Sequence, residues 1–175
     1  MNRKPPGFAL IDLMFVCGII GLLASIALPR LTRAKSAAGA ASAIGSLRAI
    51  NSAELTFALT CGAGFYAPSL TALAVAPTGS NEPFIAAGLG GANTVVKSGY
   101  IVKVEGTAFD GAPPSCNGLE SGQTGQGFKA GADPTDAQNS RHFATNANSA
   151  IYEDTSSLYA GMPETGEPPA GHPLR

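Results

Sequence analysis

The stretch from Phe8 to Leu28 reads FALIDLMFVCGIIGLLASIAL, and it decides how this chain of 175 residues folds. It holds twenty-one residues, of which only Asp12 is charged. About 20 apolar residues are enough for a helix to cross the hydrocarbon core of a bilayer. The sequence therefore predicts that this stretch is a membrane-spanning helix.

Asp12 is the unusual residue of that helix. A carboxylate inside a bilayer costs roughly 2.5–3.5 kcal/mol on insertion scales, so such a residue is a candidate for a functional role. A cation that meets the carboxylate inside the membrane lowers this cost. Cleavage between Gly7 and Phe8 would create one, because the new α-amino group would lie close to the helix.

The residues around Asp12 carry a family resemblance. The segment 7–14, GFALIDLM, resembles the processing and assembly motif of type IV pilins and type II secretion pseudopilins. The likeness continues through 16–29 and, more loosely, in 46–51 and 140–143. The family acid is usually Glu, so Asp12 keeps the charge with a reach that is one methylene shorter.

The resemblance implies a processed subunit of a filament. Residues 1–7 would be a leader that prepilin peptidase removes after Gly7, with methylation of the new amine of Phe8. Asp12 would pair with that amine on a neighbouring subunit, and the segment between Gly21 and Pro29 would lose helical structure in the filament. The implied partners are copies of this chain or related pilins in a helical filament, the peptidase, the membrane and an inner-membrane assembly platform.

The resemblance also implies a location. The N-terminus would be cytoplasmic and the globular domain periplasmic while the chain sits in the bacterial inner membrane. After assembly the chain would belong to a periplasmic or cell-surface filament.

Two other interpretations of the N-terminus remain open. An ordinary secretory signal would be cut at the small residues Ser25-Ile26-Ala27, and an uncleaved anchor would stay whole. An acid near the start of the apolar core counts against an ordinary signal. The positive-inside rule does not orient the helix, because Arg3 and Lys4 precede it while three cations follow it. These are Arg30, Arg33 and Lys35.

Residues 31–59 continue the helical pattern. Apolar residues recur at spacings of three and four, which predicts a face that seats a sheet; they are Ile44, Leu47, Ile50, Ala53 and Phe57. We expect the other side to be the one rich in small residues, which allow helices to bundle closely; they are Ser36, Ala37, Gly39, Ala40, Ser42 and Ala43. Pro29 either ends the membrane helix or lies inside a helix from Phe8 to about Ala58.

The rest of the chain predicts a small antiparallel sheet. Residues 62–94 suggest a long loop with a short helix near 69–74. Alternation in 100–105 predicts a strand with one buried face. Three shorter strands are expected around 128–130, 141–145 and 150–153, with a hairpin turn at 146–149. Residues 161–175 are expected to be a flexible Pro/Gly-rich tail.

The three cysteines divide unevenly. Cys17 lies in the apolar stretch and is expected to act as a small hydrophobe. Cys61 and Cys116 fall in the soluble part, where an oxidising periplasm would pair them. Two free thiols are the alternative.

No catalytic constellation is visible, so we do not expect an enzyme. His142 and His172 are thirty residues apart, and a lone histidine on a strand is usually structural. Four acids are weak candidates for calcium ligands, with no other cofactor expected; they are Asp133, Asp136, Glu153 and Asp154. The net charge of −1 and the lack of a basic stripe on a folded segment argue against nucleic-acid binding.

The sequence thus predicts an α+β, pilin-like fold. One long N-terminal helix would carry an about four-stranded antiparallel sheet on its C-terminal half. The expected parts are the leader 1–7, the assembly helix 8–29, the globular domain 30–160 and the tail 161–175. The expected function is a pilus subunit, with a secretion or competence pseudopilin, or a membrane-tethered binding or adhesion domain, as alternatives.

Overall fold

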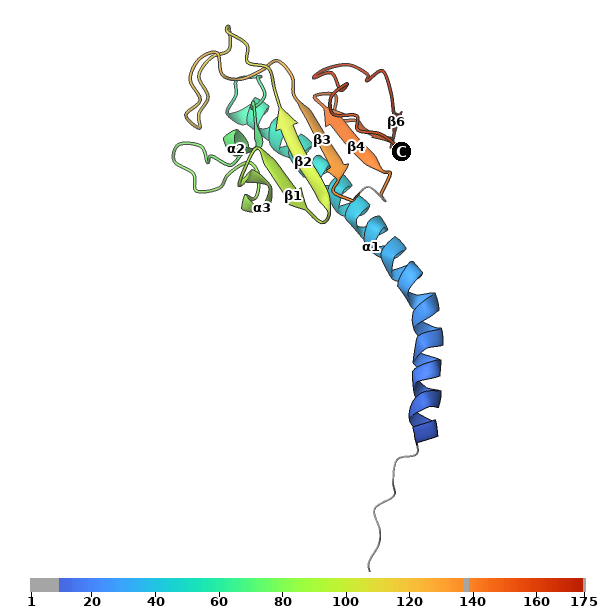
Figure 1. The fold of residues 1–175 in the computed structure, drawn as a ribbon. Coiled ribbons are helices and arrows are strands. Elements are labelled where there is room, and N and C mark those ends of the chain that lie inside the picture. Colours follow the sequence, from blue (N-terminus) through green and yellow to red (C-terminus); the bar gives the residue numbers. More distant parts are fainter. Residues whose placement is uncertain (1–9, 137–138, 175) are drawn as a thin grey trace, which may run out of the picture. The chain divides into compact units, whose positions relative to one another are not determined.

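The computed structural model describes residues 10–136 and 139–174. Within them the chain forms three helices and six strands (Figure 1). The helices are α1 (Leu10–Thr60), α2 (Leu70–Leu73) and α3 (Ala87–Gly90). The strands are β1 (Thr94–Lys97), β2 (Tyr100–Glu105), β3 (Lys129–Pro134), β4 (His142–Asn146), β5 (Ile151–Asp154) and β6 (His172–Pro173). The chain divides into two compact units, residues 1–37 and 38–175.

Helix α1 continues through Pro29, so this proline does not end it. A proline has no N–H to donate, and the carbonyl of Ser25, four residues earlier, loses its helical partner. The helix persists there because most residues on both sides are good helix formers, namely alanine and leucine before the proline and arginine, leucine, alanine and lysine after it. The hydroxyl of Thr32 donates to the carbonyl of Pro29 at 3.0 Å, within the same turn.

The six strands form one antiparallel sheet in the order β1-β2-β3-β4-β5-β6. Each strand pairs with its sequence neighbour, so the sheet is a meander. The turn between β4 and β5 closes with the N–H of Ser149 donating to the carbonyl of Asn146 at 2.8 Å. The α+β prediction is confirmed, and β1 and β6 extend the sheet beyond the four strands expected.

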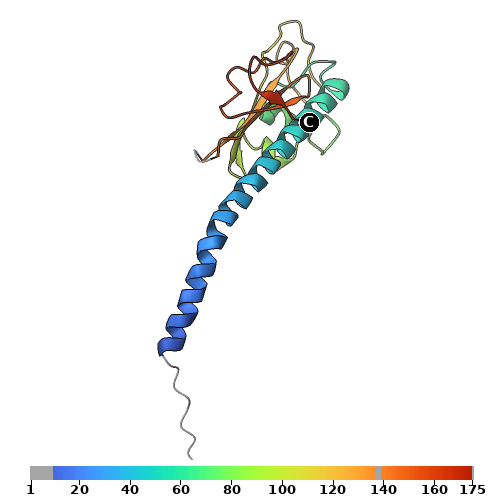
Figure 2. The same cartoon turned by 90° about the vertical axis from the view of Figure 1, so that its right-hand side faces the viewer.

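One face of the sheet packs on the C-terminal half of α1 (Figure 2). The predicted helix stripe supplies its side of this core, where Leu47, Ile50 and Phe57 are fully buried. The sheet supplies the alternate residues of β2 and the aromatic ring of Phe143 on β4. The buried sheet residues are Tyr100, Val102, Val104, Ala130, Ala132, Phe143 and Ile151.

Three of the six small residues that were expected on the side opposite the apolar stripe lie against the domain instead, while Ala37 is exposed. Gly39, Ala40 and Ala43 are buried. A Cβ on Gly39 would come within 2.8 Å of the backbone oxygen of Ser98, in the turn between β1 and β2. Small size is needed there because the helix and that turn approach closely.

The other face of the sheet is covered by the segment that follows β5. Leu158 and Met162 are buried in a second cluster with Ala144 and Tyr152. The ring of Tyr159 lies over Gly131 of β3, where a Cβ would meet it at 2.7 Å. The amines of Lys103 and Lys129 lie 5.4 and 5.2 Å from the centroid of that ring.

Residues 161–174 also differ from the flexible tail that was expected. The side chain of Glu164 accepts hydrogen bonds from the N–H and the hydroxyl of Thr107, at 2.7 and 2.6 Å. The buried amide of Asn146 donates to the carbonyls of Pro163 and Gly166, at 3.0 and 2.7 Å. Although residues 161–174 are rich in proline and glycine, they pack on the domain through their backbone carbonyls and a few side chains.

A disulfide joins Cys61 to Cys116, as predicted. Cys61 directly follows α1, whose last carbonyls are capped by the turn 61–64. The N–H of Gly62 donates to the carbonyl of Phe57, and that of Gly64 to Ala58, both at 2.8 Å. The short helix expected near 69–74 is α2, capped by the hydroxyl of Ser69.

Candidate functional site

The N-terminal part of α1 exposes its apolar side chains. Leu10, Ile11 and Phe15 are each 70% exposed or more. The helix contains an 18-residue window with a mean hydropathy of 2.4, and none of this window is buried. A core helix of a globular domain would bury such a stretch. By length and composition, α1 could therefore cross a membrane.

Asp12 lies in the first turn of α1 as the structure describes it. Within residues 10–136 and 139–174, no hydrogen bond or ion pair involves its carboxylate. Gly7 and Phe8, the predicted cleavage and methylation residues, lie outside the described residues.

Gly21 and Pro29 are both helical in this structure. A Cβ added to Gly21 would meet nothing within 4 Å. Packing within the single chain does not explain this glycine, while its low helix propensity, about 1 kcal/mol below that of alanine, weakens the helix locally. The loss of helix between these residues in a filament stays a prediction.

The second half of α1 also has an exposed face. Arg48 carries the only charge on this face among residues 38–60, and the other residues are small or apolar. They are Ala38, Ala41, Gly45, Ala49, Ser52, Leu55, Thr56, Leu59 and Thr60. A Cβ on Gly45 would meet nothing within 4 Å. This outer face of α1 is suited to close contact with another apolar helix.

The proposed calcium ligands have other partners. Asp133 accepts from the hydroxyl of Ser157 at 2.9 Å and lies 2.8 Å from Nδ1 of His142. Glu153 forms a two-point ion pair with Arg141, at 2.5 and 3.0 Å, and this contact lowers its pKa. Asp154 accepts from the N–H of Thr155 at 2.6 Å. Among the described residues, no three His, Cys, Asp or Glu side chains form a group that could hold a metal ion.

The Asp133, His142 and Ser157 side chains do not form a nucleophilic triad. A triad needs the serine hydroxyl on the imidazole, with the carboxylate behind it. Here the serine and the histidine both contact the carboxylate. The arrangement joins β3 and β4 to the segment after β5, which is a structural role.

A surface hollow of about 320 Å³ lies beside this cluster. It is lined by Ser140, Arg141, Glu153, Asp154, Thr155, Gly171 and His172. Two of its lining residues, Arg141 and Glu153, form an ion pair with each other. Asp154 also lines the hollow, so this ion pair does not remove all charge from it.

Glu54 is a buried acid that the sequence reasoning missed. It is 0% exposed, and burial raises the pKa of its carboxyl to about 8. Oε2 accepts from the N–H of Ala67 at 2.9 Å, while Oε1 has no partner among the described residues. The signal was its spacing, since Glu54 lies four residues after Ile50 and three before Phe57 on the buried stripe.

No protein-family model, curated protein or solved structure matches this chain.

Proposed function

We propose that this protein is a structural subunit of a type IV pilus or a related filament. The carrying observation is Asp12, a carboxylate on an exposed apolar helix with no partner among residues 10–136 and 139–174. A segment that only tethers a domain to a membrane gains nothing from such a residue. A segment that docks on a cationic partner inside the membrane does.

The proposed mechanism is assembly. Prepilin peptidase removes residues 1–7, and the new N-terminal amine of Phe8 is methylated. The amine of one subunit neutralises Asp12 of a neighbour at the base of the growing filament. Two opposite charges about 4 Å apart gain only about 1 kcal/mol in water, and far more in a medium of low dielectric constant. The pair would therefore fix the register of adjacent helices.

The outer face of α1 supports the same proposal. From Ala38 to Leu59 this face is poor in charge and rich in small residues, which lets helices approach closely. Subunits that leave the bilayer could bury this face and the apolar segment against each other. The proposed location is the inner membrane before assembly, with the globular unit in the periplasm.

The test replaces Asp12 by Ala in the native host. We expect cleavage and membrane insertion to continue, because both precede docking, and incorporation into sheared surface filaments to be lost. Intact mass and N-terminal sequencing should find a chain that starts at Phe8 with one added methyl.

Two controls make the test specific. Asp12→Glu keeps the charge and should retain assembly, whereas Asp110→Ala removes an exposed acid of the globular unit and should have no effect. Normal filaments from Asp12→Ala would contradict the proposal. A mature chain that begins at Leu28 would instead identify an ordinary signal peptide.

A secretion or competence pseudopilin would use the same chemistry, and the cellular system that incorporates the chain distinguishes it from a pilus subunit. The contrasting class is a membrane-tethered binding or adhesion domain. The hollow beside Arg141 is a place for a ligand in that case. Such a protein would remain a monomer in the membrane and be absent from sheared filaments.

A further inference from the structure

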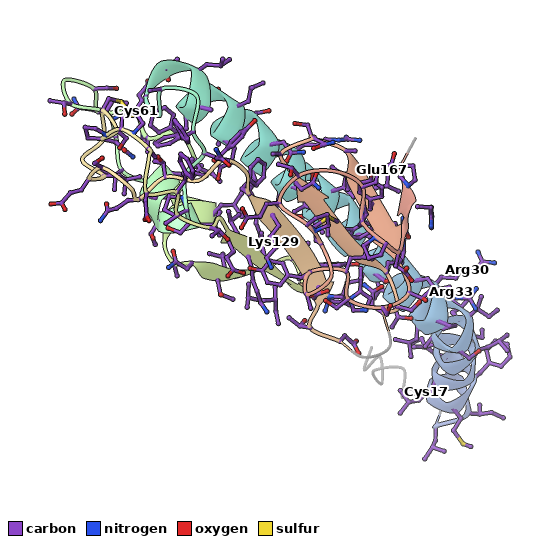
Figure 3. The ribbon with its side chains drawn as sticks, turned by 90° about the horizontal axis from the view of Figure 1, so that it is seen from above. Cys17, Arg30, Arg33, Cys61, Lys129 and Glu167 are labelled. Atoms are coloured by element: carbon purple, nitrogen blue, oxygen red, sulfur yellow. A yellow bond between two sulfur atoms is a disulfide. The ribbon has the colours of Figure 1, made fainter. Side chains whose placement is uncertain are left out.

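The cations of α1 have no acid on the same helix between Asp12 and Glu54. Three of them follow the apolar segment within seven residues of Leu28: Arg30, Arg33 and Lys35. All three are exposed, and Figure 3 shows the side chains of Arg30 and Arg33 extending from the helix. No ion pair within residues 10–136 and 139–174 involves any of them. A partner outside this chain would therefore meet an uncompensated positive charge.

Their place relative to the apolar segment sets the depth at which they would lie. Arg30 follows Asp12 by eighteen residues, which is five helical turns and a rise of about 27 Å. The hydrocarbon core of a bilayer is about 30 Å thick. When Arg30 lies at the headgroups of one leaflet, Asp12 on the same side of the helix lies near the boundary of the other leaflet.

Arginine suits this depth. Its aliphatic stem can lie along apolar surface while the guanidinium reaches the polar region. The planar guanidinium matches the geometry of phosphate with two parallel hydrogen bonds. Arg30 and Arg33 are one turn apart, so both can reach headgroups on the same side of the helix.

We propose that Arg30, Arg33 and Lys35 bind the phosphates of anionic phospholipids in the leaflet opposite the N-terminus. This headgroup cluster fixes the depth of α1 before assembly and keeps Asp12 near the boundary of the other leaflet. An acidic protein partner is the competing class. The lipid is favoured because the cluster begins one residue after Pro29, at the end of the apolar segment, where insertion itself brings phosphates within reach.

The inference rests on the membrane placement of α1 and not on filament assembly, so its test uses the unassembled full chain. The chain is reconstituted in vesicles of phosphatidylcholine with phosphatidylglycerol. Spin-labelled lipids then measure how strongly phosphatidylglycerol is enriched at the protein. The native chain should prefer it at least several-fold, since even one cation near an anionic surface contributes a factor of about five.

The double variant Arg30→Gln/Arg33→Gln should lose most of this preference. The matched control is Arg48→Gln/Lys97→Gln, which removes two exposed cations from the globular unit and should keep it. A nitroxide on Cys17, the exposed cysteine outside the disulfide, reports depth. In the double variant, Lys35 is the first cation after the apolar segment, two residues beyond Arg33. The helix should shift so that Lys35 reaches the headgroups, which moves the label by about 3 Å or more toward the leaflet at the N-terminus.

Each other outcome would overturn the proposal. Unchanged lipid preference in the Arg30/Arg33 variant means that the cluster does not bind headgroups. An equal loss in the control variant means that the effect is one of net charge. Unchanged lipid preference combined with lost filament incorporation in the Arg30/Arg33 variant would assign the cations to an acidic neighbour. The proposed role of Asp12 in assembly would not be affected by this result, because the Asp12→Ala variant tests it separately.

Discussion

Glu54 combines two features that rarely occur together, complete burial and a carboxyl oxygen with no partner among the described residues. A charged carboxylate is strongly disfavoured in such a place, so the group keeps its proton. Burial raises its pKa from 4.5 to about 8, and the hydrogen bond from Ala67 offsets this only in part. The folded domain therefore holds a proton at neutral pH that the unfolded chain releases.

This proton predicts that stability falls as the pH rises. Between pH 4.5 and about 8 the folded state binds the proton and the unfolded state does not. In this window the free energy of unfolding should decrease by up to about 1.4 kcal/mol per pH unit. Denaturant unfolding of the full chain in a non-ionic detergent at several pH values measures the slope.

Glu54→Gln should remove this slope, because an amide does not titrate. Its absolute stability is not the test, since the amide brings donors of its own into the core. Glu82→Gln, at an exposed acid, should keep the native slope. A slope that survives in Glu54→Gln would show that another group releases the proton.

At the scale of the element, two glycines of α1 should respond in opposite ways to alanine. Gly45 lies on the outer face with open space beside it, so Gly45→Ala should stabilise the domain by about 1 kcal/mol through helix propensity. Gly39→Ala should destabilise it, because the new methyl would meet the oxygen of Ser98 at 2.8 Å. Thermal melts followed by circular dichroism compare the two variants, and equal shifts would contradict this account of their packing.

The same elements show what sequence patterns can predict. The helix stripe and the alternation in β2 were predictable, because burial on one face imposes a period on the sequence. The exposed strand β1 lacks such a period, since none of its four residues is buried. β6 has two residues, one of them a proline that cannot donate to a ladder, so it could only be an edge strand. Both strands depend on neighbours that the local sequence does not reveal.

At the scale of the whole molecule, part of the candidate site was predictable from the sequence and part was not. The exposed apolar segment and Asp12 were identifiable because a hydrophobic run with one charge is a local signal. The partners of Asp133 and Glu153 were not, since they come from β4 and from the segment after β5. Composition also misjudged residues 161–174, where few apolar side chains are needed because the buried Asn146 binds two backbone carbonyls of the segment.

That segment yields a prediction for the whole domain. A chain that ends at Asp154 would lose Leu158 and Met162 from the second cluster and leave the amide of Asn146 without its acceptors. Full burial of each of these two side chains stabilises a fold by about 1.5–3 kcal/mol, and a buried donor without a partner costs about 1–3 kcal/mol. We expect a large drop in melting temperature and rapid proteolysis. A chain that ends at Gly171 loses β6 and the partly buried Leu174 but keeps the second cluster and the acceptors of Asn146, so it should melt much closer to the native chain. If the two truncated chains melted alike, the segment would be the flexible tail that its composition suggested.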